Sequence, residues 1–349
     1  MHDDCELVTI VDSIIYHTLD IWDEVKLISK YKHGRHETDW QTFTVGEQAE
    51  IQCRLALAWM RLGMLPGERV AIMAVNRPRW IFTLNGLLTA HLTAVPIYPT
   101  LTAEQAAYIL EDSGSKYVVV DTLAQGEKIL SVMGRLPQLK GIYIMDRLER
   151  RPDPPLHPFD ALLESVPEPI DARRLYVRAR MGAPETGDEA SCAEEGSELL
   201  CRRIRGIQGE DVAVIVYTSG TTGKPKGVML THQNFLGQRP VQKGFNVSPD
   251  DVFLNHLPFS HCFGLTADLF GSSFVPKPPA KRMKINAPLA TLWVREASSK
   301  YMRPVTSLPK KIPMARAIRI KGTFNLREMR AKNTTNIRII AVVASIYSS

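Results

Sequence analysis

Residues 212–227 decide the fold of this chain, and they read Val-Ala-Val-Ile-Val-Tyr-Thr-Ser-Gly-Thr-Thr-Gly-Lys-Pro-Lys-Gly. The first five are β-branched or small and apolar, which predicts a buried strand. The loop that follows consists mainly of glycine, hydroxyl and lysine residues. Glycine lets backbone N–H groups approach an anion closely, and the hydroxyls and lysines add donors and positive charge. This composition predicts a loop that holds a polyphosphate.

The spacing of this loop separates it from two other phosphate-binding motifs. A Walker A loop has four residues between its first glycine and its Gly-Lys pair. Here only two residues separate Gly220 from Gly223, and Pro225 follows Lys224. The third glycine is also misplaced for a dinucleotide-binding fingerprint. A flexible polar loop without a ligand is the alternative interpretation, but so many glycines, hydroxyls and lysines directly after a buried strand favour a phosphate loop.

The motif extends beyond the loop, as Gly227-Val228-Met229-Leu230-Thr231-His232-Gln233-Asn234-Phe235. The whole stretch resembles the phosphate loop of the adenylate-forming superfamily, which includes acyl-CoA synthetases, luciferases and the adenylation domains of peptide synthetases. The resemblance implies ATP-dependent activation of a carboxylate as an acyl-adenylate, followed by transfer to a thiol. It implies a catalytic role for Lys224. It also implies that the β- and γ-phosphates are held by Thr218, Ser219, Gly220, Thr221, Thr222, Gly223 and Lys224.

A second stretch, Leu257-Pro258-Phe259-Ser260-His261-Cys262-Phe263-Gly264, resembles another segment of the same superfamily. Without that context, a histidine between aromatic residues is more often a hydrogen-bonded core residue. The resemblance implies that His261 lies beside the acyl-adenylate as a catalytic and substrate-binding residue. It also implies that Phe263 and Gly264 line the pocket for the acyl chain.

The N-terminal third alternates between helical and strand patterns. Apolar periodicity and turn signals predict helices over 47–62, 78–90 and 102–112, and strands over 70–75, 94–99 and 117–120. Strands that alternate with helices predict parallel βαβ units. The fold class is therefore α/β, with mostly parallel sheets flanked by helices, and the resemblance implies the N-terminal part of the superfamily's large domain. Residues 96–102 and 108–120 most resemble the branch of long-chain fatty acid–CoA ligases.

Four regions are predicted along the chain. Residues 1–175 form an N-terminal α/β subdomain, 176–209 an acidic and polar linker, 210–275 the phosphate-loop segment of a second α/β subdomain, and 276–349 a basic tail, expected to be poorly ordered. The tail carries 16 lysines and arginines against two glutamates, in a chain whose net charge is +6. It is interpreted as a basic arm for nucleic acid or anionic lipid, as a divergent domain, or as aberrant out-of-frame sequence. The third is favoured, because nothing in the tail resumes the resemblance.

The later motifs of the superfamily, which complete its nucleotide pocket, are not found in the sequence. We therefore expect a truncated long-chain fatty acid–CoA ligase, AMP-forming, whose turnover is impaired or lost. The alternatives are a non-catalytic nucleotide-binding remnant and a nucleic-acid binder that uses the basic tail. The expected substrates and cofactors are a fatty acid, ATP, Mg²⁺ and coenzyme A, and no residue is named as a protein ligand for the metal.

Bulk properties bound the setting. Hydrophobic residues make up 44% of the 349 residues, which is typical of a globular protein. Five cysteines, without metal-ligand spacing or a leader sequence, predict reduced thiols and a cytoplasmic location. No apolar run reaches the roughly 18 residues that span a bilayer, so any membrane contact is expected to be peripheral. No specific nucleic-acid partner is expected, and the sequence does not indicate an oligomeric state.

Overall fold

The computed structural model describes residues 7–20, 22–23, 25–32, 35–181, 192–218, 223–237, 251–255, 257–270, 282–285 and 338–340. The helices are α1 (Ile10–Asp20), α2 (Val45–Arg61), α3 (Pro78–Thr89), α4 (Ala103–Ser113), α5 (Leu123–Met133), α6 (Asp160–Glu164), α7 (Ala172–Met181), α8 (Cys192–Arg205), α9 (His232–Leu236) and the π-helix η1 (Gly264–Phe270). The strands are β1 (Val25–Lys32), β2 (Arg35–Thr44), β3 (Arg69–Met73), β4 (Thr93–Pro96), β5 (Tyr117–Val120), β6 (Gly141–Ile144), β7 (Leu156–Pro158), β8 (Val212–Thr218), β9 (Lys226–Thr231), β10 (Asp251–Asn255), β11 (Arg282–Ile285) and β12 (Arg338–Ile340).

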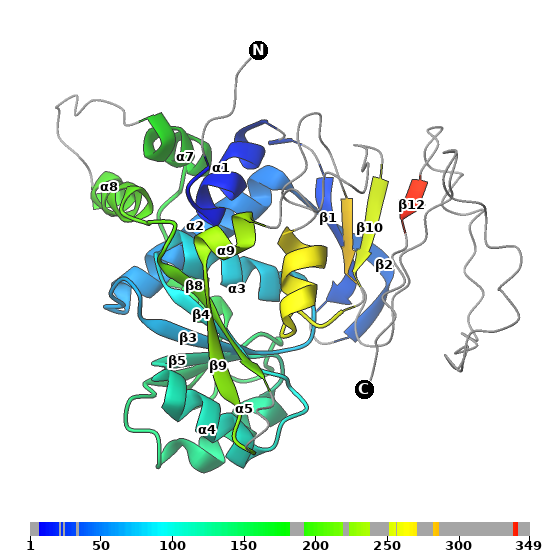
Figure 1. The fold of residues 1–349 in the computed structure, drawn as a ribbon, viewed down its shortest axis with the longest axis vertical. Helices are drawn as coiled ribbons and strands as arrows, with labels where there is room; N and C mark the ends of the chain where they lie inside the picture. Colours follow the sequence, from blue (N-terminus) through cyan, green and yellow to red (C-terminus); the bar gives the residue numbers. More distant parts are fainter. Residues whose placement is uncertain are drawn as a thin grey trace, which may run out of the picture.

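A seven-stranded sheet organises the molecule (Figure 1). Its strand order is β7-β6-β5-β3-β4-β8-β9, and every neighbouring pair is parallel except the β8–β9 hairpin. Helices α3, α4 and α5 connect the strands from β3 to β6, as the alternating sequence pattern predicts, whereas β6 and β7 are joined without a helix. The predicted α/β fold class is therefore confirmed.

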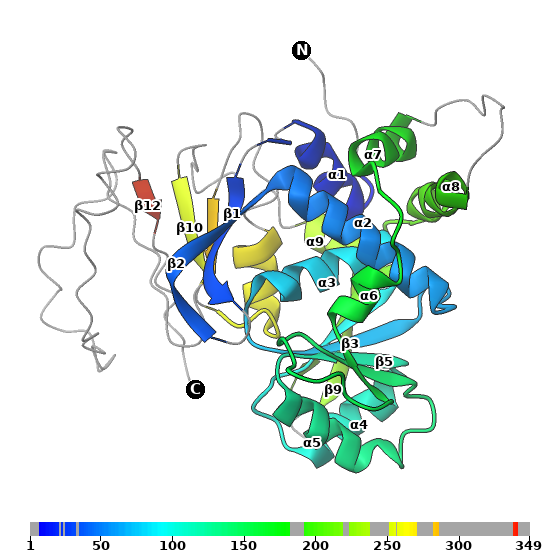
Figure 2. The ribbon, with the colours of Figure 1, turned by 180° about the vertical axis from the view of Figure 1, so that it is seen from behind.

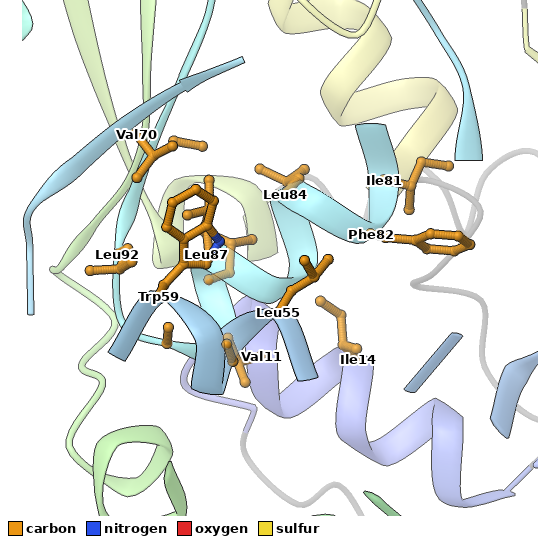
Figure 3. Close-up of a cluster of buried hydrophobic side chains, with 14 of the residues drawn as sticks. Val11, Ile14, Leu55, Trp59, Val70, Ile81, Phe82, Leu84, Leu87 and Leu92 are labelled. Carbon is orange, nitrogen blue, oxygen red and sulfur yellow. The ribbon is translucent and has the colours of Figure 1, made fainter. Parts of the chain in front are cut away.

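Helices cover both faces of this sheet, and β3 shows why (Figure 2). Its successive side chains point to opposite faces because a strand has a period of two. Val70 and Ile72 belong to one core cluster, whereas Ala71 and Met73 belong to the other. The larger cluster joins the sheet to α1, α2 and α3, and Figure 3 shows Trp59 and the side chains around it. The smaller cluster lies under α4 and α5.

Capping residues fix α4, the helix that matters most for the site. Thr102 caps its first turn, since its hydroxyl accepts from the Gln105 N–H and the Gln105 side chain accepts from the Thr102 N–H. Gly114 ends it in the left-handed region, at φ 61°. Both ends agree with the predicted helix over 102–112. The predicted strand over 117–120 is β5.

A second sheet has the order β12-β10-β11-β1-β2 among the described strands. Strands β11 and β12 are the only parts of the predicted basic tail, 276–349, that the structure describes. The rest of the tail, which was expected to be poorly ordered, lies outside the described residues. Within the described ranges, no helix combines the length and the apolar character that a membrane crossing requires.

The segment expected to be a polar linker, 176–209, differs from that prediction. Helix α7 overlaps its start and α8 occupies much of the remainder, while 182–191 lies outside the described residues. Tyr176 and Cys201 are completely buried, and Arg178 of α7 pairs with Glu198 of α8 at 2.6 Å. The acidic composition suggested a linker, but Leu200, Cys201 and Ile204 have helical spacing and pack in the core.

Candidate functional site

The carboxyl edge of the seven-stranded sheet gathers the predicted site segments. Strands β3, β4 and β8 run parallel, so the residues that follow them lie along one edge. The phosphate loop follows β8, and Asn76, which binds the histidine segment, follows β3. In open α/β sheets, ligands bind outside the carboxyl ends of the strands. Both predicted segments therefore meet the sheet where a ligand site is expected.

The phosphate loop joins two strands of an antiparallel hairpin. Thr218 at the end of β8 pairs with Lys226 at the start of β9. Ser219, Gly220, Thr221 and Thr222 lie outside the described residues. Gly223 has φ +95°, a backbone conformation that glycine adopts without the strain a side chain would bring. Lys224 and Lys226 are exposed, so two ammonium groups are available to an anion at this end of the hairpin.

Helix α4 contacts the same end of the hairpin. The Tyr108 hydroxyl donates to the Pro225 carbonyl at 3.1 Å, and the Lys224 ammonium lies 5.5 Å from the centre of the Tyr108 ring. The Tyr217 hydroxyl donates to Asp112 Oδ2 at 2.6 Å. Burial, followed by this bond to the carboxylate, raises the pKa of Tyr217. The phenol therefore stays protonated and holds β8 against α4.

Part of the signature after the loop has a structural explanation. A Cβ at Gly227 would come within 3.0 Å of the Tyr217 ring, so glycine lets the ring lie across β9. The Thr231 hydroxyl accepts from the Asn234 N–H at 3.2 Å, and Asn234 Oδ1 accepts from the Thr231 N–H at 3.0 Å. This capping box begins α9 and turns the chain back over the sheet.

Asn76 fastens the histidine segment to the N-terminal subdomain. Its Nδ2 donates to the Leu257 carbonyl at 2.7 Å, and its Oδ1 accepts from the Phe259 N–H at 2.8 Å. The ring of Phe259 packs at 5.0 Å from that of Trp80, between centroids, and both side chains are fully buried. Asn76 therefore hydrogen-bonds two backbone groups of this segment, and Asn255 Nδ2 donates to the same Leu257 carbonyl at 3.3 Å.

The local fold of the segment fixes the orientation of His261. Its Nδ1 accepts from the Phe263 N–H at 3.1 Å, so in the neutral ring the proton lies on Nε2. The side chain is exposed, as is that of Phe263 at 44%. Gly264 begins η1, and a Cβ there would lie 2.3 Å from the Pro258 carbonyl oxygen. Glycine therefore allows the chain to turn sharply after the histidine.

The turns near this segment lie at the carboxyl edge of the sheet. The Val75 N–H donates to Asp121 Oδ2 at 3.1 Å, which joins the turns after β3 and β5. These two strands are neighbours whose connections leave in opposite directions, the topological switch point of this sheet order. Tyr98, after β4, has its pKa raised by burial and then by the nearby Cys262. The histidine segment thus lies over the turns after β3 and β4.

The structure connects both predicted segments to one N-terminal unit. Lys224 contacts α4, whereas Cys262, next to His261, lies near the turn that leads into α4. Sequence reasoning missed Asn76, Tyr108 and Asp112. A polar residue directly after a buried strand marks Asn76, and an i,i+4 pair of polar-tipped side chains marks Tyr108 and Asp112. Among the described residues, no group of three or more His, Cys, Asp or Glu side chains could hold a metal ion.

The fold defines an α/β protein whose mostly parallel sheet carries, at its carboxyl edge, a hairpin loop of glycine, hydroxyl and lysine residues. The family model of AMP-binding enzymes matches residues 23–275. This chain therefore belongs to the AMP-binding enzyme family.

The proteins that are similar to this chain include two curated proteins and one solved structure. The chain is 29% identical over 246 residues to the long-chain-fatty-acid–CoA ligase heimdall of Drosophila melanogaster, covering 68% of this chain and 32% of that protein. It is 28% identical over 265 residues to the long-chain-fatty-acid–CoA ligase ACSBG1 of Rattus norvegicus, covering 74% and 33%. The crystal structure of the anthranilate CoA ligase AuaEII in complex with anthranoyl-AMP has a TM-score of 0.58 at 21% identity, covering 79% of this chain and 44% of that one. The chain spans about a third of the length of these curated relatives.

Proposed function

We propose that this chain carries the triphosphate-binding part of an AMP-forming acid–thiol ligase whose acid is a long-chain fatty acid and whose thiol is coenzyme A. The observation that supports this most directly is the β8–β9 hairpin at the carboxyl edge of the parallel sheet. Its loop combines glycines, hydroxyls and two exposed lysines. The curated relatives named as long-chain-fatty-acid–CoA ligases favour a fatty acid over other carboxylates.

The reaction has two steps. A carboxylate oxygen attacks the α-phosphorus of ATP, the bond from that phosphorus to the pyrophosphate oxygen breaks, and the acyl-adenylate forms. The coenzyme A thiolate, its proton released to solvent, then attacks the acyl carbon, and the bond to AMP breaks. Neither step needs a covalent bond to the protein. Catalysis then rests on positioning the reactants and stabilising negative charge.

The residues of this chain have separate roles in the proposal. Lys224 and the hydroxyl of Thr218 bind the β- and γ-phosphates, together with backbone and hydroxyl donors of 219–223. His261 offers its Nε2 proton to an oxygen of the acyl-adenylate, because Nδ1 is already engaged by the Phe263 N–H. The exposed ring of Phe263, beside Gly264, provides apolar surface for the acyl chain.

Mg²⁺ fits the donors of this loop only indirectly. The loop supplies N–H, hydroxyl and ammonium groups, and Mg²⁺ prefers carboxylate, phosphate and water oxygens. We therefore propose that Mg²⁺ enters with the nucleotide, where it supplies positive charge to the triphosphate.

Calorimetric titration with MgATP tests the triphosphate site. Lys224→Ala is expected to weaken binding by about 1.5–3 kcal/mol, the range for a hydrogen bond to a charged group. Lys140→Ala is the matched control, because this exposed lysine precedes β6 and therefore lies at the amino edge of the same sheet. Equal weakening by both substitutions would indicate a nonspecific charge effect and would contradict the loop assignment.

Formation of palmitoyl-CoA from palmitate, ATP and coenzyme A tests the ligase reaction itself. Benzoate and acetate in place of palmitate test the acid class, and pantetheine in place of coenzyme A tests the thiol. MgATP binding without any thioester from these substrates would support a nucleotide-binding role and contradict the ligase assignment for this chain. Thioester formation with benzoate but not palmitate would contradict the long-chain specificity.

A further inference from the structure

Tyr108 makes two contacts with the phosphate loop that no other described side chain makes. Its hydroxyl donates to the Pro225 carbonyl at 3.1 Å, and its ring lies 5.5 Å from the Lys224 ammonium. We propose that Tyr108 is a positioning residue that holds Lys224 and the Pro225–Lys226 peptide in place for the triphosphate. The proposal rests on the triphosphate-binding function proposed above, and it adds to that site a residue of α4, which packs on the same sheet as the β8–β9 hairpin.

Helix α4 is a firm support for these contacts. Its capping box and the left-handed Gly114 fix its two ends. Its inner face is buried against β3 and β5 through Ala106, Ala107, Ile109 and Leu110. Tyr108 is half-buried between that inner face and the solvent. The backbone that carries Tyr108 is therefore held in place by the core. The end of the hairpin that Tyr108 contacts is exposed.

A second tyrosine makes the contact two-sided. Tyr217 belongs to β8 and donates to Asp112, which is four residues after Tyr108 on α4 and so on the same helical face. One bond thus runs from the helix to Pro225, the residue directly before β9, and the other runs from the end of β8 to the helix. The pair fixes both ends of the loop to α4.

The ring of Tyr108 acts on the charge of Lys224. A cation within about 6 Å of an aromatic centroid is attracted by the negative face of the ring. A long lysine side chain otherwise samples many rotamers, and fixing them on binding costs free energy. By limiting those rotamers before the nucleotide arrives, Tyr108 is expected to lower that cost. The hydrogen bond from Tyr108 to the Pro225 carbonyl limits the backbone in a similar way. The proline ring adds to this limit because it fixes φ.

Tyr108→Phe and Tyr108→Leu separate the two contacts. The first retains the ring and removes the hydroxyl, and the second removes both. Each contact is expected to contribute about 2–5-fold to MgATP affinity, so Phe weakens binding by about that factor and Leu by about 10-fold. Glu111→Gln is the matched control on the exposed face of α4, and its affinity for MgATP should be unchanged. Circular dichroism and the melting temperature establish that the variants fold.

Two readouts do not need the nucleotide. Trypsin cleaves after lysine unless proline follows, so Lys226–Gly227 is the cleavable bond at this end of the loop and Lys224–Pro225 is resistant. Cleavage after Lys226 should accelerate in Tyr108→Phe and further in Tyr108→Leu. The ring current of Tyr108 should shift the ε-methylene protons of Lys224 upfield in the NMR spectrum. That shift should persist in Tyr108→Phe and vanish in Tyr108→Leu, an order that a general packing role does not predict.

The outcomes separate the two proposals. If the unmodified chain binds no MgATP, the proposed function fails, while proteolysis and the lysine shift still decide whether Tyr108 holds the loop. If the unmodified chain binds MgATP and Tyr108→Leu matches it in affinity, cleavage rate and lysine shift, the role of Tyr108 is overturned. If Tyr108→Leu does not fold, Tyr108→Phe decides, because equal cleavage and equal affinity in that variant would remove the hydroxyl from the proposal.

Discussion

The side chain of Asn76 and the backbone of Phe259 meet through a hydrogen bond of 2.8 Å between the Phe259 N–H and Asn76 Oδ1. The same amide donates through Nδ2 to the Leu257 carbonyl at 2.7 Å. A single side chain at the carboxyl end of β3 thus orders a segment that lies about 180 residues later in the chain. His261 follows Phe259 by two residues, so its position depends on this amide.

Asn76→Ala is therefore expected to destabilise the fold. The substitution removes the acceptor for the Phe259 N–H and the shorter of two amide hydrogen bonds to the Leu257 carbonyl, which also accepts from Asn255 Nδ2 at 3.3 Å. A buried donor or acceptor that loses its hydrogen bond costs about 1–3 kcal/mol. Asn76→Asp keeps the acceptor for the Phe259 N–H but turns a carboxylate oxygen toward the Leu257 carbonyl and Asn255 Oδ1, so it should not restore the stability. Urea denaturation measures both, with the exposed Glu127→Ala as the control. Equal stability of Asn76→Ala and the unmodified protein would contradict the role of the amide.

Gly264→Ala should be among the most damaging single methyl additions in the described chain. The new Cβ would lie 2.3 Å from the Pro258 carbonyl oxygen, and that oxygen belongs to backbone that accepts from the His261 N–H at 2.9 Å. Backbone must therefore move, at a cost of about 1–3 kcal/mol or more. Gly134→Ala is the matched control, because nothing lies within 4 Å of its Cβ position and its φ is −59°. Comparable melting temperatures for the two variants would contradict this account.

Local patterns predicted the elements that depend on neighbours in sequence. The capping residues Thr102 and Gln105 and the terminal Gly114 determine α4, and the run 117–120 is apolar enough to be a buried strand. The strand 212–216 before the phosphate loop was likewise visible as a β-branched run, although β8 continues to Thr218. These features depend on side-chain period and caps, which are present in the sequence itself.

The contacts that assemble the site could not be predicted in this way. Asn76 and Phe259, or Tyr108 and Pro225, are brought together only when the sheet order is known. Helix α8 was also missed. Most of its residues are polar, so the composition of the segment indicated a linker, although a few buried side chains hold the helix in the core. The roles of Lys224 and His261 remain predictions from the motif, and the structure adds the partners that orient them.

Cysteine alkylation should follow burial. Cys53 is fully buried, and burial raises its pKa to about 12, whereas Cys262 is exposed. Because the thiolate is the reactive form, iodoacetamide at pH 8 should modify Cys262 in the native protein and leave Cys53 unmodified. Cys53 should react at least about 10³-fold more slowly, at the rate set by unfolding, and should react rapidly in concentrated urea. Mapping by mass spectrometry measures both sites, and rapid native labelling of Cys53 would contradict the packing of α2.

His232, the first residue of α9, should make the fold sensitive to mild acid. Its side chain is 2% exposed, and burial, followed by the nearby His91, lowers its pKa to about 4, while Asp211 acts in the opposite direction. The folded state therefore favours the neutral ring, and unfolding takes up a proton below the ordinary pKa of about 6.5. The resulting stability, about 3 kcal/mol, is fully present above pH 6.5 and is lost as the pH falls toward 4.

Urea denaturation at intervals between pH 7 and pH 5 tests this sign and this residue. The free energy of unfolding should fall by about 1.4 kcal/mol per pH unit below pH 6 from this histidine alone. His232→Asn removes the titrating ring, and its packing cost is the same at every pH, so only the slope is informative. The slope should become shallower in that variant because the remaining carboxylates titrate mainly below pH 5. An unchanged slope would place the acid sensitivity elsewhere in the chain.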